Sequence, residues 1–482
     1  MLKKNIIYQV LYQIIILFVP LILSKYVTNV FSKETLGIYN YSYSIANYFV
    51  LLGMLGIQKY GTRLISQNKE NSLDLRKAFW SLMIVHLFFS TISLIAFIII
   101  SFFVDKNNSN IVLLQALYVA SSLFDITWLF YGLENFKSVV FKNLFIKIAE
   151  VFLILIFVKT NSDLWKYTLI MSSSVFLGQI VMIPQAIKQI KPIKIGINEL
   201  KIHVKPLLIL SIAVLSTSIY GVLDKVILGL LSPNGKGDVS IYEYSDKIVR
   251  IPLNIIAAIE TAMLPKMSYI SQYENEKKLK EIIENSTVII SMISIGAMFG
   301  IASISNSFTI LWYGKDFAQC SNVIFLLSPI IFICSFGDII RSQYLIPQKK
   351  DTYYTISLVV GAVLNLFLNL TLIPSYGIYG AILGTIVSEL FISFMQLIFV
   401  KKEINIFKLI IKPLPYFFCG FIIFSLNKIM EHFFKISYLL LILQISLGLI
   451  VYLCLIFLCI KIFEKNLFLY LRNYNKRKEK KE

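Results

Sequence analysis

The chain has 482 residues, of which 57% are hydrophobic and only 15% are charged. Soluble domains have about 25% charged residues, so this composition excludes a water-soluble globular protein and predicts an all-α integral membrane protein whose surface faces lipid. A formal net charge of +19 is typical of proteins that bind nucleic acid, but the positions of the basic residues, described below, argue against such a partner.

Fourteen apolar stretches are long enough to cross a bilayer as helices, for which about 20 residues are needed. In chain order they cover residues 6–30, 38–58, 78–104, 111–133, 139–158, 165–187, 206–231, 241–264, 286–313, 322–345, 353–373, 377–400, 412–428 and 438–461. The first stretch extends beyond the apolar core of a typical signal peptide. We therefore interpret it as the first membrane helix.

The positions of Lys and Arg predict the topology, because cytoplasmic loops are enriched in these residues. With the N-terminus inside, the cytoplasmic segments contain 32 basic residues and the outer loops contain 8. This bias supports an even number of helices with both termini in the cytoplasm. The positive charge is then a topology signal, with a basic tail near anionic lipid, rather than a nucleic-acid site.

The chain also contains an internal repeat with a spacing of about 200 residues. Ile38-Tyr39-x-Tyr41-Ser42-x-x-Ile45 recurs as Ile241-Tyr242-x-Tyr244-Ser245-x-x-Ile248. Shorter matches keep the same order: Leu23-x-Lys25 with Leu223-x-Lys225, Ile65-Ser66-Gln67 with Ile270-Ser271-Gln272, Asp125-Ile126 with Asp338-Ile339, and Leu177-Gly178-x-Ile180-Val181 with Leu383-Gly384-x-Ile386-Val387. Such a period in apolar sequence is typical of a transporter made of two similar lobes.

Repeat and topology together predict the domain organisation. Six crossings separate the two copies, so both begin on the cytoplasmic side and form parallel repeats. We expect an N-terminal lobe of six helices at 1–187, a basic cytoplasmic linker at 188–205, and a second six-helix lobe at 206–402, with a central cavity between the lobes. Residues 403–482 add two further helices and a basic cytoplasmic tail.

Ionisable side chains inside the predicted spans are the candidate functional residues. Each costs about 2.5–3.5 kcal/mol at a helix centre, so such residues face a cavity or a partner. Five cations are candidates for binding an anionic headgroup: Lys25, Lys225, Lys247, Arg250 and Arg341. Five acids are candidates for ion coupling or for structural roles: Asp125, Asp224, Asp246, Asp338 and Glu389. Glu150 and Glu260 are further acids inside spans.

The alternative role for these charges is internal ion pairing. Glu243 and Lys247 are four residues apart, as are Asp246 and Arg250, and Lys147 and Glu150 are three apart. Each pair therefore shares a helix face. Lys25 and Lys225 occupy matching positions in the two repeats and would place one cation on each wall of a central cleft, although Lys25 could instead extend to the outer interface.

Catalytic and metal-binding motifs are missing from the sequence. The three His and five Cys are scattered and have no zinc spacing, so we expect no metal and no cofactor. There is no phosphate-binding Gly-x-x-x-x-Gly-Lys-Ser/Thr loop and no long soluble loop that could hold a catalytic centre. We therefore expect a protein that is not an enzyme. Tyr39, Tyr41, Tyr43 and Tyr48 could stack on sugars, but packing or an interfacial position is the favoured role.

Three stretches resemble the polysaccharide repeat-unit flippases of bacterial O-antigen and capsule pathways. They are Asp125-x-x-Trp128-x-Phe130-x-Gly132-Leu133-Glu134-x-Phe136-Lys137, Tyr220-x-x-Leu223-Asp224-Lys225-x-x-Leu228-Gly229, and the segment from Ile241-Tyr242 through Lys247 and Arg250 to Pro252. These flippases are part of the multidrug/oligosaccharidyl-lipid/polysaccharide exporter superfamily. Members have twelve to fourteen helices in two lobes.

The resemblance implies a function. Such a protein would move an undecaprenyl-diphosphate-linked oligosaccharide from the inner to the outer leaflet of the bacterial cytoplasmic membrane by alternating access. Membrane lipids would be partners, and a polysaccharide polymerase and a chain-length regulator are further candidates. The resemblance implies that the five cations bind the diphosphate.

Several other functions remain open. A peptidoglycan lipid-precursor flippase would have a comparable cavity, but the Asp125-x-x-Trp128 motif disfavours it. A cation-coupled drug exporter would favour an acidic, aromatic pocket, against which the matched lysines argue. An integral membrane polysaccharide polymerase would need catalytic groups on an outer loop, and the outer loops are short. A structural scaffold would not explain the charges inside the spans.

Overall fold

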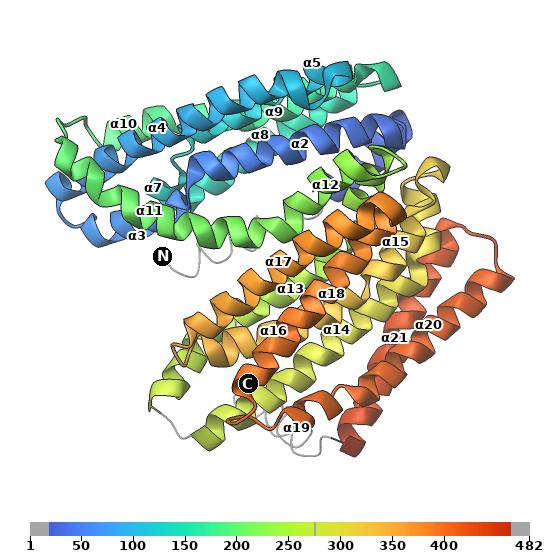
Figure 1. Ribbon diagram of the computed structural model, residues 1–482. Coiled ribbons are helices and arrows are strands. Elements are labelled where there is room, and N and C mark those ends of the chain that lie inside the picture. The colour runs from blue at the N-terminus through green and yellow to red at the C-terminus, as the bar shows by residue number, and fades with distance from the viewer. Residues whose placement is uncertain (1–18, 274–275, 464–482) are drawn as a thin grey trace, which may run out of the picture. The chain divides into compact units, whose positions relative to one another are not determined.

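The computed structural model describes residues 19–273 and 276–463, without the side chains of 212–217, 219 and 220. Within this part of the chain every regular element is a helix and there is no strand (Figure 1). Ten helical stretches are long and apolar enough to cross a bilayer. These observations confirm the predicted all-α membrane protein.

The predicted spans from the second onward coincide with helices. Three of these helices are not among the ten apolar stretches and have 22 residues each: α2 (Lys33–Met54), α8 (Phe136–Phe157) and α11 (Ile197–Ser218). Most of the first predicted span lies outside the described residues. Its described part, residues 19–30, is helical.

The described chain forms two compact units. The first extends to Ser240 and also includes Ile373–Ile378, whereas the second contains Ile241–Leu372 and the residues from Tyr379 onward. The boundary falls inside α13 (Gly237–Tyr273) and α17 (Asp351–Tyr376). The first unit includes α11, which the repeat assigns to the second lobe, so the lobe boundaries stay a prediction.

In the first unit, α2 packs against α4, α3 packs against α4 and α7, and α9 packs against α6 and α8 (Figure 1). Its remaining helices have these bounds: α3 (Ile57–Asn68), α4 (Ser72–Val104), α5 (Ser109–Leu114), α6 (Ala116–Ser121), α7 (Thr127–Gly132), α9 (Leu164–Ile180), α10 (Ile183–Gln189) and α12 (Asp224–Leu231). Helix α12 packs against α2. This contact places the residues after the seventh span beside the start of the second.

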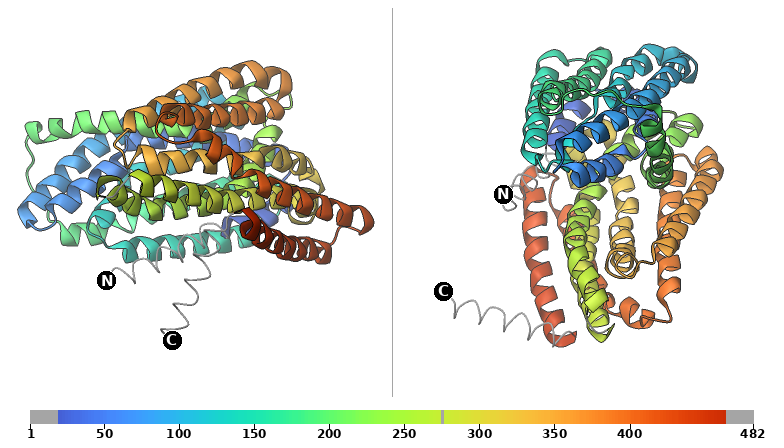
Figure 2. Two further views of the ribbon diagram at one scale, coloured as in Figure 1. Left: turned by 90° about the horizontal axis from the view of Figure 1, so that it is seen from below. Right: turned by 90° about the vertical axis from the view of Figure 1, so that its left-hand side faces the viewer.

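In the second unit, α14 contacts α15, α16, α20 and α21. The bounds are α14 (Glu276–Trp312), α15 (Cys320–Leu327), α16 (Pro329–Ile340), α18 (Ile378–Val400), α19 (Ile406–Ile411), α20 (Leu414–Phe433) and α21 (Tyr438–Phe463). Helices α20 and α21, drawn in red, form a pair joined by a short turn (Figure 2). They are the two helices that the sequence places outside the repeat.

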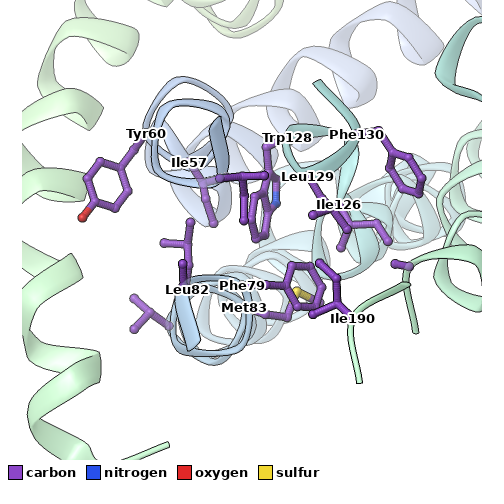
Figure 3. Packing of buried hydrophobic residues seen from close by; sticks show 14 of the residues in the cluster. Ile57, Tyr60, Phe79, Leu82, Met83, Ile126, Trp128, Leu129, Phe130 and Ile190 are labelled. Atoms are coloured by element: carbon purple, nitrogen blue, oxygen red, sulfur yellow. The ribbon is translucent and has the colours of Figure 1, made fainter. Parts of the chain in front are cut away.

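The core of the first unit surrounds Trp128, which is fully buried on α7. Its ring stacks on Phe79 of α4 with centroids 5.4 Å apart, and its Nε1 donates to the carbonyl of Asp125 at 3.0 Å. Figure 3 shows Trp128 among the apolar side chains of the cluster, which include Ile57 and Met83. The Asp-x-x-Trp motif therefore fixes α7 between α3 and α4.

Two helices contain a π-helical turn. The first, η4 (Ile219–Leu223), directly precedes Asp224, and the second, η6 (Arg341–Leu345), directly follows α16. In η6 the amide of Ile346 donates to the carbonyl of Arg341, five residues earlier. Such turns are rare in proteins, and those that occur are often found at functional sites. Both lie beside charged residues that the sequence analysis selected.

A loop after α12 is held against the ends of α2 and α4. Lys236 forms an ion pair with Asp105, and its ammonium lies 5.3 Å from the centre of the Tyr41 ring. We call Gly37, Tyr41, Asp105 and Lys236 the Lys236 cluster. The topology prediction places the loops that contain Asp105 and Lys236 on the outer side of the membrane.

Neighbouring contacts hold the same loop in place. Asp238 Oδ2 accepts from Ser232 Oγ at 2.6 Å and from the amide of Ile378 at 3.2 Å. Ser240 Oγ donates to the carbonyl of Lys33 at 2.7 Å. Segments from three distant parts of the sequence therefore meet at one end of the first unit.

Gly37 allows the closest approach in this cluster. A Cβ atom at this position would lie 2.0 Å from the carbonyl oxygen of Lys236 and 2.4 Å from its carbonyl carbon. Because both atoms belong to the backbone, no side chain can move aside. We expect Gly37→Ala to destabilise the fold by about 1–3 kcal/mol, measured as a lower melting temperature of the detergent-purified protein.

The matched control is Gly300→Ala on α14, because a Cβ at Gly300 would meet no atom within 4 Å. Alanine in a helix interior is favoured over glycine by up to about 1 kcal/mol, so this variant should melt at the same or a higher temperature. Equal melting temperatures for the two variants would contradict the close approach at Gly37.

The loops predicted to be cytoplasmic are joined by exposed contacts of their own. In the first unit Lys69 and Glu134 form an ion pair of 2.7 Å, and the bond from Lys69 lowers the pKa of Glu134. In the second unit, burial raises the pKa of Glu403, but contacts from Lys350 and Tyr344 outweigh it and place the pKa below its usual value. Arg76 donates to the carbonyls of Lys191 and Pro192, at 2.9 and 2.8 Å.

Candidate functional site

Five charged residues of the second unit that the sequence analysis selected lie on four helical elements. Arg250 and Asp246 lie on α13, Asp338 lies on α16, Arg341 begins η6, and Glu389 lies on α18. Glu389 interacts electrostatically with Asp338 and with both arginines. The structure therefore brings together five of the ten residues that the sequence analysis selected.

Arg250 is the most available cation in this group. Its Nε donates to Asp246 Oδ2 at 2.7 Å, four residues earlier on the same helix face. The side chain remains 45% exposed, and among the described residues only Asp246 bonds it. The two terminal amino groups of the guanidinium, which match a pair of phosphate oxygens, remain available.

Arg341 has a second carboxylate beside it. Its Nη1 lies 2.7 Å from Asp338 Oδ1, and its guanidinium carbon lies 5.7 Å from the centre of the Tyr354 ring. The π turn that begins at Arg341 changes the direction of side chains within a single turn. Stacking and pairing together fix this arginine more tightly than Arg250.

Lys247 forms the predicted pair with Glu243, with Nζ and Oε1 separated by 3.1 Å. Its ammonium also lies 4.9 Å from the centre of the Tyr244 ring. The lysine side chain is 45% exposed. Two ion pairs, Glu243 with Lys247 and Asp246 with Arg250, therefore follow one another along α13, and the side chains of both cations remain partly exposed.

The charges of the first unit are more fully satisfied. Lys147 is paired with Glu150, which also accepts from Ser174 Oγ at 2.8 Å, so these residues hold α8 and α9 together. Asp125 Oδ1 accepts from the amide of Thr127 at 3.0 Å and from its hydroxyl at 2.5 Å. This local turn gives Asp125 a structural role at the start of α7.

Three further candidates also belong to the first unit. Lys25 is half-buried on the helix at 19–30. Asp224 is buried and Lys225 half-buried at the start of α12, directly after η4. All three interact with other groups in the structure. A diphosphate-binding role for Lys25 and Lys225 stays a prediction.

The tyrosines of α2 mainly pack against protein. Tyr39 stacks on Tyr43 at 6.0 Å and meets the edge of Tyr167 at 4.7 Å. Tyr43 in turn contacts Tyr118, with hydroxyl oxygens 3.3 Å apart. These contacts favour packing over sugar binding for this part of the α2 surface.

An apolar cavity of about 550 Å³ lies between α14, α20 and α21. Its described lining includes Gly296, Asn427, Gln444 and Tyr452 but no ionisable Asp, Glu, Lys, Arg or His. It therefore cannot neutralise a diphosphate. Across the described residues, no group of three His, Cys, Asp or Glu side chains is arranged to hold a metal ion.

Sequence reasoning missed two features of the structure. Lys236 was counted only as an outer-loop cation, although it pairs with Asp105, 131 residues away. Glu260 was recognised inside a span but not selected, although it is buried without a hydrogen-bond partner among the described residues. Its charge inside an apolar stretch was the only available signal.

Comparisons with known proteins agree with this architecture. A family model described as polysaccharide biosynthesis protein matches residues 2–271. A protein of Shigella dysenteriae described as an O-antigen transporter is 25% identical over 406 residues, which cover 83% of this chain and 100% of the relative. One with the same description from Escherichia coli K12 is 21% identical over 407 residues, covering 83% and 97%.

The fold is also similar to that of a solved transporter. The structure of the lipid II flippase MurJ in an inward closed conformation matches with a TM-score of 0.73. The match covers 97% of this chain and 100% of the other, at 19% sequence identity. This similarity concerns the fold.

Proposed function

Since this chain belongs to the family of polysaccharide biosynthesis proteins, we propose that it is a flippase for oligosaccharide repeat units that are linked to a lipid diphosphate. The relatives described as O-antigen transporters support a transport function rather than an enzymatic one. The observation on which the proposal mainly rests is Arg250, a half-exposed arginine on a membrane helix that retains two unused amino groups. Asp246 pairs with its Nε, so the terminal amino groups can bind a further anion.

The substrate in this proposal is undecaprenyl-diphosphate-linked oligosaccharide. Arg250 would bind the diphosphate through its terminal amino groups, and Lys247 would add a point charge one turn earlier on α13. Arg341 would join them only after it leaves Asp338, with which it pairs at 2.7 Å, and the Tyr354 ring beside it. The lipid tail would remain in the bilayer.

The transport cycle in this proposal is alternating access. Two lobes, 1–187 and 206–402, would open in turn to the cytoplasm and to the outer side around a central cavity. The linker at 188–205 would connect them, and both termini would lie in the bacterial cytoplasm. A polysaccharide polymerase and a chain-length regulator would act on the flipped units.

Deletion of the chain in its native host tests this function. We expect surface polysaccharide to disappear and lipid-linked repeat units to accumulate on the inner leaflet, where a membrane-impermeant probe reaches them only in inside-out vesicles. Re-expression of the full chain should restore the polymer. Normal polymer in the deletion strain would contradict a flippase role, and repeat units that accumulate on the outer leaflet would indicate a polymerase instead.

A further inference from the structure

Glu260 differs from the other acids in the helices of this protein. It lies on α13 and is 2% exposed, yet neither carboxylate oxygen has a hydrogen-bond partner among the described residues. Glu150 is equally buried but is bonded by Lys147 and Ser174. Of the other three acids of this region, Asp246 pairs with Arg250 and Asp338 with Arg341. The third, Glu389, is less buried than Glu260 and is hydrogen-bonded with Cys334.

The surroundings of Glu260 contain one further acid and one arginine. Its electrostatic neighbours are Asp338 of α16 and Arg341 of η6. Arg341 is already paired with Asp338 and stacked on Tyr354, so its charge is largely neutralised. Glu260 therefore lies beside a satisfied ion pair, and no cation of the described part of the chain forms an ion pair with it.

An ionised carboxylate cannot remain in such a position at low cost. The free energy of transfer from water into an apolar medium is far less favourable for an ionised carboxylate than for a neutral polar group. The usual outcome is that the buried acid binds a proton. A neutral carboxyl also provides an O–H donor. One helical turn farther along α13, Met263 contacts Gln343, and Gln343 Oε1 is itself buried without a donor.

The balance of charge in the second unit leads to the same conclusion. Asp246, Glu260, Asp338 and Glu389 form one group of acids. Among the described residues Arg250 and Arg341 oppose them, because Lys247 is paired with Glu243. Two negative charges are therefore in excess if every acid of the group is ionised, and a proton on Glu260 reduces this excess.

We propose that Glu260 is a proton-binding residue whose proton is taken up and released during the transport cycle. This inference rests on the proposed function. In the conformation seen here Glu260 holds its proton beside the paired Asp338 and Arg341. When Arg341 turns to an anionic headgroup, Asp338 loses its partner and competes for a proton. Movement of the substrate would thus change the protonation of the Glu260 and Asp338 pair.

Infrared spectroscopy of the purified protein tests the proton directly. Glu260→Gln replaces the protonated carboxyl by a neutral group of the same shape, so the fold should persist. We expect wild-type protein at neutral pH to show a carboxylic-acid C=O band that loses intensity in Glu260→Gln. The matched control is Glu150→Gln, because Glu150 is buried equally but ion-paired. That variant should keep the band.

Transport in vesicles tests the coupling. Wild-type protein is reconstituted with an undecaprenyl-diphosphate-linked oligosaccharide, and its rate is measured with and without a pH gradient and, separately, with a sodium gradient. The pH gradient should accelerate wild type and Glu150→Gln severalfold and should have no effect on Glu260→Gln. The sodium gradient should have no effect on any of them.

The outcomes separate the two proposals. If wild-type protein moves no substrate, the proposed function is wrong. If wild type is active and Glu260→Gln responds to the pH gradient as wild type does, the inference about Glu260 is wrong. An unchanged carboxylic-acid band in Glu260→Gln, or acceleration of wild type by sodium alone, would also overturn it. The inference is supported if Glu260→Gln loses both the carboxylic-acid band and the response to the pH gradient, whatever transport rate this variant retains.

Discussion

Arg250→Ala should lower the amount of surface polysaccharide at least tenfold at unchanged protein levels. The guanidinium offers a phosphate two parallel bonds, and hydrogen bonds to charged groups contribute about 1.5–3 kcal/mol each. A loss of about 1.4 kcal/mol already corresponds to a factor of ten in binding. The measurement is immunoblotting of the polymer, normalised to the amount of protein in the membrane.

Three further variants separate binding from folding. Arg250→Ala leaves Asp246 without its partner, so the double variant Arg250→Ala/Asp246→Asn should recover stability but not polymer. Arg250→Lys keeps the positive charge but cannot donate two parallel hydrogen bonds to a phosphate, so it should retain partial activity. Arg63→Ala, at an exposed arginine that lies over the Tyr60 ring, is the control and should behave as wild type. Normal polymer from both Arg250→Ala and Arg250→Lys would remove Arg250 from the mechanism.

Joining positions 105 and 236 should stop transport almost completely. Asp105 and Lys236 form an ion pair that connects the loop after α4 with the loop after α12. The repeat predicts that these loops belong to different lobes, although both lie in the first compact unit of the described chain. In the proposed cycle, opening to the outer side would separate them. A short bifunctional thiol reagent applied to Asp105→Cys/Lys236→Cys should therefore reduce flipping in vesicles at least tenfold, and a cleavable reagent should allow recovery after reduction.

The controls for this experiment are the two single-cysteine variants and the wild-type chain, all treated with the same reagent. The wild type has five cysteines of its own, none of them in a disulfide, so its response defines the background. Normal flipping by fully cross-linked protein would show that these loops stay together throughout the cycle. The untreated double variant should remain active, because it removes both partners of the ion pair and so leaves neither charge buried without its partner.

Much of the fold follows from hydrophobic patterning. Each predicted span from the second onward is helical, although several are divided between successive helices, because a bilayer admits few alternatives to a helix for an apolar stretch of this length. Three ion pairs also follow from spacing alone. Lys147 and Glu150 are three residues apart, the other two pairs (Glu243 with Lys247, Asp246 with Arg250) are four apart, and all three form.

Contacts between distant segments could not be predicted in this way. The pairing of Lys236 with Asp105 depends on how α12 packs against α2, which no local pattern describes. Glu260 is distinguished by the lack of a hydrogen-bond donor to its carboxylate among the described residues. Such a donor would come from a neighbouring helix, so the local sequence could not show that it is missing. The assignment of α11 to the first compact unit likewise depends on packing and not on the repeat.

The π turn at Arg341–Leu345 has a consequence for how this chain could change over generations. A π turn accommodates one residue more than an α-helical turn, so gain or loss of a single codon can create or remove it without breaking the helix. In a regular α-helix each residue added or removed rotates everything beyond it by about 100°. The π turn takes up its additional residue within one turn, so the helix on either side keeps its direction. A one-codon change there would therefore alter the side chains of the turn itself and leave Asp338, which precedes it, in place.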